Sequence, residues 1–207
     1  MSDLHSINEA INKRAGRKLG PSIVVSLFLL ALIWFALAYE RVIFAGLVTA
    51  AVILGLREMR MALSTSNIAI SFKALTLASL GLGYASWVGG VAGLAIATAI
   101  AFPCLLIWLL REGPEQFVAK ATATSLALIY LPFLAGFIIL LARPSNGLAQ
   151  VMTFVVLVGC NDTFGYLVGV LIGKHPMAPK ISPKKSWEGL VGSMIFTPVG
   201  GALTFHY

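Results

Sequence analysis

The sequence predicts an all-α integral membrane protein, a polytopic bundle of about seven transmembrane helices that forms one transmembrane domain over residues 1–207. Two observations lead to this fold class. Hydrophobic residues make up 58% of the chain and charged residues only 11%, with a mean hydropathy of +0.91. A water-soluble core of this size cannot hide so much apolar surface. Apolar runs of membrane-crossing length also follow one another along most of the chain.

A helix needs about 20 apolar residues to cross roughly 30 Å of hydrocarbon. The run from Ala74 to Leu110 is too long for one helix, and glycines cluster near its middle, so we divide it near Trp87 to Gly90. Pro132 should kink the span in which it lies. The predicted spans are Ser22 to Tyr39, Val42 to Leu56, the two halves of Ala74 to Leu110, Ala121 to Ala142, Leu148 to Gly173, and Leu190 to Tyr207.

The distribution of Lys and Arg predicts the orientation, because retained positive charge marks the cytoplasmic side of a membrane. Residues 1–20 are polar and basic, and the apolar run after them has no cleavage site, so we expect a cytoplasmic N-terminus and an uncleaved first span. Thirteen basic residues then fall inside and two, Arg41 and Arg143, outside. If Ala74 to Leu110 were one helix, the counts would be eight and seven. The division is therefore favoured, and segment 174–188 faces the cytoplasm.

The net charge of +7 does not indicate nucleic-acid binding, because the basic residues lie between apolar runs and are not interleaved with aromatic residues. The two cysteines lie within apolar segments and form no spaced ligand set, so neither a disulfide framework nor a zinc site is indicated. We attribute the basicity to membrane topology and to one site for an anionic ligand.

Asp162 is the one acidic residue inside a predicted span, where a carboxylate is costly unless it meets water, a cation or a partner. On a helix, Asp162 shares a face with Tyr166, Gly169 and Gly173, and Gly165 lies at its edge. Glycines four residues apart let another helix approach closely, so we expect this face to point into the bundle. Asp162 is then a metal or proton site, or a buried carboxyl bonded to a neighbouring helix.

The segment from Lys174 to Glu188 combines four lysines and His175 with three prolines. Ammonium groups suit phosphate oxygens, and prolines reduce the entropy lost when a loop orders around a ligand. The alternative is a basic anchor attracted to anionic headgroups. Glu188 has three interpretations: a metal ligand, a partner of a lysine, or the first-turn acid of the last helix.

This region resembles a known family. Asp162-Thr163, Tyr166, Gly169, Gly173-Lys174-His175, Pro179, Ile181-Ser182-Pro183 and Lys185-Ser186-Trp187-Glu188-Gly189 are similar, in order and spacing, to a conserved block of the bacterial phosphatidate cytidylyltransferases, or CDP-diacylglycerol synthases. Phe164-Gly165 stands where the family usually has Gly-Ala. Family members also carry a more C-terminal signature, a Lys/Asp and His-Gly-Gly string that ends in Asp-Arg-x-Asp, which residues 1–207 do not contain. We therefore expect an incomplete two-metal arrangement in a chain of 207 residues.

The resemblance implies a multi-pass enzyme of the bacterial inner membrane that joins CTP to phosphatidate with Mg²⁺, releasing diphosphate. It implies contact with anionic lipids and no nucleic acid, and a homodimer is a possible assembly. It makes Asp162 and Lys185 the catalytic residues, with Asp162 as the metal ligand. The residues it assigns to substrate binding are Lys174, His175, Lys180, Ser182, Lys184, Ser186 and Glu188.

Other functions remain open at this stage. A transporter would use Asp162 to bind a proton or cation and would need the lysines only as an anchor. A non-catalytic scaffold would be a truncated, inactive member of the family. A CTP-dependent lipid kinase would also need an acid and a cytosolic basic loop. A transporter would bind no nucleotide, and a scaffold would fold or assemble without turnover.

Overall fold

The computed structural model describes residues 19–180 and 182–204, and the side chains of residues 24–180, 182 and 185–204. Its helices are α2 (Leu19–Tyr39), α3 (Arg41–Ser64), α4 (Phe72–Arg111), α5 (Phe117–Leu128), the π-helical segment η1 (Ile129–Phe133), α6 (Leu134–Ala142), α7 (Gly147–Ile172) and α8 (Trp187–Thr204). The strands are β1 (Pro176–Ala178) and β2 (Ser182–Ser186). The predicted polar N-terminal segment, with Lys13 to Lys18, lies outside the described residues.

The predicted all-α membrane class is confirmed. Within the described residues, four helical stretches are long and apolar enough to cross a membrane: Arg41–Ser64, Phe72–Arg111, Phe117–Ala142 and Gly147–Ile172. Most helix bounds differ from the prediction by one to four residues, and the end of α3 differs by eight. Helix α3 continues past Leu56 through Arg57 and Arg60, and α8 begins at Trp187 rather than at Leu190.

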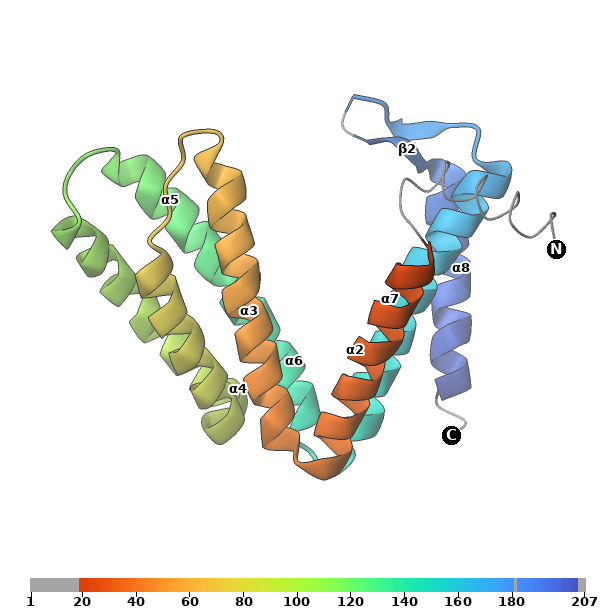
Figure 1. Ribbon diagram of the computed structural model, residues 1–207, viewed down its shortest axis with the longest axis horizontal. Coiled ribbons are helices and arrows are strands. Elements are labelled where there is room, and N and C mark those ends of the chain that lie inside the picture. Colours follow the sequence, from red (N-terminus) through yellow and green to blue (C-terminus); the bar gives the residue numbers. More distant parts are fainter. Residues whose placement is uncertain (1–18, 181, 205–207) are drawn as a thin grey trace.

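The 40-residue α4 folds back on itself where the glycines predict a turn. Gly90 has φ 64° and ψ −146°, a conformation that L side chains rarely adopt. A Cβ on Gly93 would lie 2.2 Å from the carbonyl oxygen of Ala85, so the close approach of the two halves also requires glycine. Figure 1 shows the two halves of α4 as a helical hairpin.

Pro132 has the predicted local effect. It lies within η1, a π-helical turn between α5 and α6. A π turn accommodates a residue that cannot donate a backbone hydrogen bond, so α5, η1 and α6 continue as one stretch across the proline.

The helices form two groups that diverge from a common base (Figure 1). One hydrophobic cluster joins α3, α4 and α5 through buried leucines such as Leu56, Leu109 and Leu128. A second cluster at the base joins α2, α3, α6 and α7, with Leu37, Phe44 and Val151 among its buried members. We call this the basal end, and we call the opposite end, which carries β1 and β2, the hairpin end.

Two arginines hold the basal end together. One guanidinium nitrogen of Arg41 donates to the carbonyl oxygens of Arg143, at 3.1 Å, and of Pro144. Arg143 in turn donates to the carbonyl of Val88, at 3.2 Å, beside the break in α4. The Arg143 and Pro144 carbonyls lie between α6 and α7, and that of Pro144 also accepts the Gly147 N–H at 2.8 Å. Arg41 and Arg143 are the two basic residues that the charge count places outside. In the structure, both donate hydrogen bonds to backbone carbonyls.

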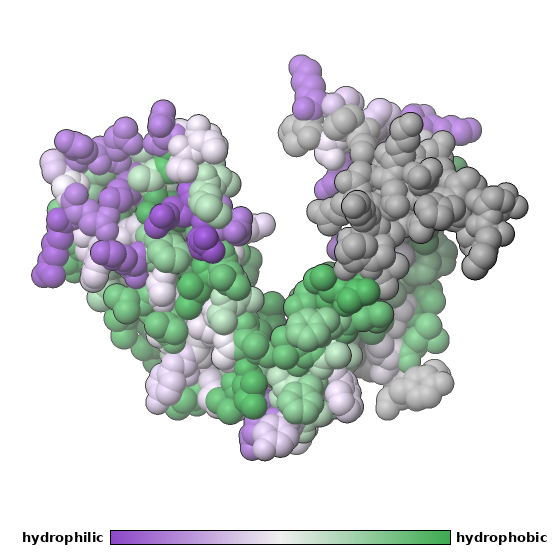
Figure 2. All heavy atoms as spheres, in the orientation of Figure 1, coloured by the Kyte–Doolittle hydropathy of each residue, from purple (hydrophilic) through white to green (hydrophobic). Residues whose placement is uncertain are grey.

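Polar side chains gather on the hairpin end of the α3–α5 group, above a predominantly apolar middle (Figure 2). Glu112 is the centre of one hydrogen-bond network among these polar side chains. It accepts hydrogen bonds from the Ser71 hydroxyl at 2.6 Å and the Trp108 indole at 2.8 Å, and it pairs with Lys120. Burial raises the pKa of Glu112, but the hydrogen bonds from Lys120, Ser71 and Trp108 outweigh burial and lower it overall. The network joins the α3–α4 turn, the end of α4 and the start of α5.

We expect Glu112→Ala to lower the free energy of unfolding by about 1–3 kcal/mol, because it leaves the buried Ser71 hydroxyl without its acceptor. Since the pKa of Glu112 is lowered on folding, its contribution is present above the unfolded pKa and is lost as the pH falls through the folded value. Thermal unfolding in detergent measures this cost, with Glu115→Ala, an exposed acid of the same loop, as the control. Equal melting temperatures for the two variants would contradict a structural role for Glu112.

Candidate functional site

A short antiparallel hairpin stands at the end of α7, where the sequence analysis expected a proline-stiffened loop. Strand β1 pairs with β2, with Pro176 opposite Ser186 and Ala178 opposite Ser182. Each strand has only one partner, so a proline can lie on its free edge without breaking a ladder hydrogen bond. The hairpin places a compact basic element between α7 and α8.

His175 and Glu188 close the base of the hairpin. The Nδ1 atom of His175 lies 2.6 Å from a Glu188 carboxylate oxygen, and the backbone N–H of His175 donates to the other oxygen at 3.3 Å. The Trp187 N–H also donates to the His175 carbonyl at 3.0 Å. Of the three interpretations of Glu188, the structure favours a first-turn acid of α8, and its partner is the histidine rather than a lysine. The His175 side chain is 77% exposed, which leaves the rest of its ring accessible.

Glu188 precedes the apolar stretch that begins at Leu190. The hydrogen bond from His175 lowers its pKa from 4.5 to about 2. Because the folded pKa is depressed, this carboxylate stabilises the hairpin fully above pH 4.5, and the effect fades as the pH falls toward 2. We therefore expect Glu188→Gln to reduce thermal stability at pH 6 and to differ less from the wild type as the pH approaches 2. Melting curves over this range test the expectation, and a gap that stays constant with pH contradicts it. Glu115→Gln is the control.

Ser186 caps α8. Its hydroxyl oxygen accepts the backbone N–H of Gly189 at 3.2 Å, the usual geometry of a serine before the first helical turn. A Cβ on Gly173 would lie 2.5 Å from this hydroxyl, so the end of α7 packs directly against the cap. The predicted contact of Ser186 with substrate stays a prediction, and the structure adds a positioning role.

Helices α7 and α8 approach closely along a line of small residues. A Cβ on Gly189 would lie 2.7 Å from the carbonyl oxygen of Gly165 and 3.2 Å from Cα of Gly169. Farther along, Gly200 packs against Cys160. The expectation that the α7 glycines allow close helix packing is confirmed. This pairing fixes the hairpin to the membrane-embedded part of the chain.

The structure corrects one part of the expected α7 face. Asp162 and Tyr166 are exposed rather than turned into the bundle, and the Tyr166 side chain is 59% exposed. Asp162 also precedes the end of α7 by about 15 Å at 1.5 Å per residue. The structure therefore does not place Asp162 beside the hairpin, although both belong to the same helical pair.

The remaining predicted residues form a basic surface at the hairpin end. Lys174, Lys180 and Lys185 are exposed, and Ser182 is half-buried in β2. The side chain of Lys184 lies outside the described residues. Since Glu188 is engaged by His175, the three described ammonium groups face solvent with no hairpin carboxylate to neutralise them. Such an arrangement suits the oxygens of phosphate groups.

The described residues offer a Mg²⁺ ion no more than a small ligand set. Among the described residues, no three His, Cys, Asp or Glu side chains gather closely enough to hold a metal. Magnesium keeps several waters and commonly binds one or two carboxylates together with substrate phosphates. The exposed carboxylate of Asp162 satisfies that minimal requirement.

Sequence reasoning missed the Glu112 network and the arginine contacts at the basal end. Lys120, Arg41 and Arg143 were used only in the count of basic residues that predicts the membrane orientation. The available signal was Glu112 itself, an acid directly after a long apolar helix and eight residues before a lysine.

Comparisons with known proteins agree with the resemblance. The model of the cytidylyltransferase family matches residues 21–207. A phosphatidate cytidylyltransferase of Mycobacterium bovis is 31% identical over 196 residues, which are 88% of this chain and 64% of the relative. The phosphatidate cytidylyltransferase of Mycobacterium leprae is 30% identical over 211 residues, which cover 92% of this chain and 66% of the relative. A Haemophilus influenzae protein of the same name is 31% identical over 121 residues, which cover 56% of this chain and 40% of the relative. The chain thus spans somewhat less than two thirds of its first curated relatives, and these matches give the transport alternative no support.

Proposed function

The chain belongs to the cytidylyltransferase family, and on this basis we propose that it is a phosphatidate cytidylyltransferase. The reaction joins CTP and phosphatidate to give CDP-diacylglycerol and diphosphate, in phospholipid biosynthesis. The observation that carries the proposal is the exposed basic hairpin, held on α7 and α8, next to a helix that carries an acidic residue within its apolar sequence. A membrane enzyme that handles two anionic reactants needs both features.

The chemistry requires positioning and charge neutralisation more than covalent participation by the protein. A phosphate oxygen of phosphatidate attacks the α-phosphorus of CTP, the bond to the β-phosphate breaks, and diphosphate leaves with that electron pair. We assign Lys174, Lys180, Lys184 and Lys185 to the phosphate oxygens, with Lys185 as the catalytic lysine. Ser182 and Ser186 would donate hydrogen bonds, and His175 would lie at the edge of the site.

We further propose that Asp162 binds Mg²⁺. The ion would neutralise charge on the reacting phosphates. Because Asp162 lies deeper than the hairpin, the phosphates would have to lie between Asp162 and the lysines. Phosphatidate is anchored in the membrane by its acyl chains, so its headgroup can approach α7 from the lipid side.

The proposed topology has seven spans, with the N-terminus in the cytoplasm and the chain in the bacterial inner membrane. Two features support it. The α4 hairpin at Gly90 lets the connections alternate between the two ends of the bundle (Figure 1). The described basic residues also concentrate at the hairpin end, where cytosolic CTP would arrive.

The test is cytidylyl transfer from labelled CTP to phosphatidate in detergent micelles, with and without Mg²⁺, using the purified chain. The expected result is Mg²⁺-dependent CDP-diacylglycerol. A chain that is folded by circular dichroism, binds CTP and forms no product would instead support the non-catalytic scaffold. Failure to bind CTP as well would contradict the assignment of the hairpin.

A further inference from the structure

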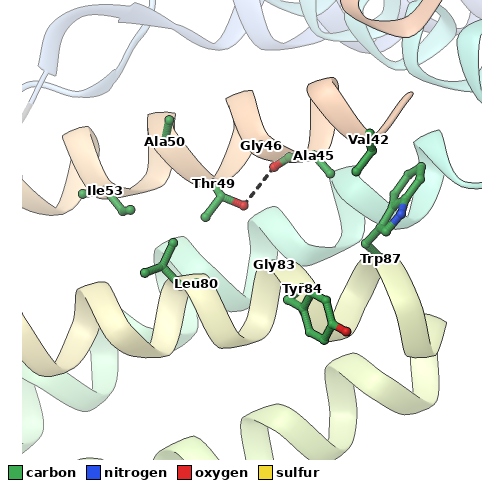
Figure 3. Close-up of a pocket in the computed structure, with 10 residues that line it drawn as sticks. All are labelled: Val42, Ala45, Gly46, Thr49, Ala50, Ile53, Leu80, Gly83, Tyr84 and Trp87. Atoms are coloured by element: carbon green, nitrogen blue, oxygen red, sulfur yellow. Dashed lines mark hydrogen bonds between the residues drawn. The ribbon is translucent and has the colours of Figure 1, made fainter. Parts of the chain in front are cut away.

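A second feature lies at the basal end, away from the hairpin. Helices α3 and α4 enclose a groove of about 330 Å³ whose lining is almost entirely apolar. The residues that line it are Val42, Ala45, Gly46, Thr49, Ala50, Ile53, Leu80, Gly83, Tyr84 and Trp87. The one side-chain hydroxyl in the middle of the groove, on Thr49, is bonded to the Ala45 carbonyl at 2.8 Å and so presents no free donor (Figure 3).

The groove exists because small residues on α3, such as Ala45, Gly46 and Ala50, face Gly83 on α4. Gly83 packs so closely that a Cβ there would lie 2.5 Å from the Thr49 hydroxyl oxygen. At Gly46, by contrast, a Cβ would meet nothing within 4 Å, so that part of the groove is open. Trp87 lies near Val42 at one end of the groove (Figure 3). Aromatic side chains of this kind are typical of the membrane–water interface.

Positive charge lies at the same end. Arg41 immediately precedes Val42, and Arg143 donates to the carbonyl of Val88, the residue after Trp87. The ion pairs formed by described residues are Lys120–Glu112 and His175–Glu188, so neither arginine is paired with a carboxylate in this part of the chain. Glu40, exposed beside Arg41, offsets some of the charge without forming an ion pair. Each guanidinium group has more donors than its described carbonyl contacts use.

From this juxtaposition we propose that the α3–α4 groove binds one acidic phospholipid, with an acyl chain between the helices and the phosphate at Arg41 and Arg143. The lipid site is separate from the proposed active site, because the two lie at opposite ends of the bundle. A helix from a second copy fits less well, because an apolar helix face offers no anionic group to Arg41 and Arg143 at the end of the groove. An apolar chain capped by an anionic headgroup matches both the lining and the charge.

The test uses Gly46→Leu, which fills the open part of the groove and leaves both arginines in place. Gly81→Leu is the matched control, since Gly81 is also an exposed helical glycine with nothing within 4 Å of its Cβ position and does not line the groove. The probes are phosphatidylglycerol and phosphatidylcholine with the same acyl chains. Lipid retained by the purified full chain is counted by native mass spectrometry after delipidation and titration.

The expected result is one retained phosphatidylglycerol on the wild type and on Gly81→Leu, with retention reduced at least tenfold on Gly46→Leu. A milder variant, Arg41→Gln, should weaken phosphatidylglycerol binding roughly fivefold and leave phosphatidylcholine unchanged. Equal retention of the two lipids by the wild type would overturn the charge assignment. Equal lipid retention by Gly46→Leu and Gly81→Leu would overturn the assignment of the lipid to the α3–α4 groove. A loss of dimers in Gly46→Leu with unchanged lipid retention would assign the groove to a second copy instead.

Discussion

Asp162→Asn is expected to reduce Mg²⁺-dependent CDP-diacylglycerol formation by roughly 10²- to 10³-fold, the range observed when one electrostatic stabiliser of a reaction is removed. Asparagine keeps the size and the hydrogen-bonding capacity of aspartate but loses the negative charge that holds a cation. The substitution should not unfold the chain, because Asp162 is exposed. A neutral amide is also less costly than a carboxylate within an apolar helix.

A loss of activity without a loss of stability in Asp162→Asn separates a metal-binding role of Asp162 from a structural one. Product formation is measured as a function of Mg²⁺ concentration, and the melting temperature is measured on the same preparations. Activity should fall in the variant while the melting temperature stays equal or rises. Glu115→Gln makes the same chemical change at an exposed loop position and should leave both values unaltered. If Asp162→Asn turns over at the wild-type rate, the active site must be assembled without this carboxylate.

The spacing of residues along α7 predicted some of its contacts with neighbouring helices and not others. Glycine spacing identified the contact with α8 correctly, because close helix approach depends on side-chain size, and size can be read from one sequence. The position of Asp162 could not be derived in the same way. Helical spacing shows which residues of α7 share a face, but the sequence of α7 does not encode which of them a neighbouring helix covers.

Other differences have equally local causes. The turn at Gly90 was predicted because a long apolar run had to reverse and glycines marked the place. The β-hairpin was missed because three prolines suggested an irregular loop, whereas a two-stranded ribbon has free edges that tolerate proline. Some contacts of Glu112 and of the basal arginines join residues far apart in the chain: Ser71 and Glu112 are 41 positions apart, and Arg41 and Arg143 are 102 positions apart. Pairings over such separations depend on tertiary packing.

The glycine contact between α7 and α8 leads to the second large expected effect. Gly189→Ala adds one methyl group that would lie 2.7 Å from the carbonyl oxygen of Gly165, a backbone atom that cannot rotate away. Either the two helices separate or the start of α8 shifts, and the cap at Ser186 shifts with it. We expect a loss of about 1–3 kcal/mol in the free energy of unfolding, the usual cost of overpacking.

A matched variant isolates the contact. Gly159→Ala makes the same change on α7, where a Cβ meets nothing within 4 Å, and replacing an exposed helical glycine should stabilise the helix by up to about 1 kcal/mol. The two alanine variants should therefore move the unfolding midpoint in opposite directions in detergent. CTP binding should weaken only in Gly189→Ala, because the hairpin lysines depend on the α7–α8 pair for their position. Parallel shifts in both variants would mean that helix propensity, and not close packing, sets the stability of this pair.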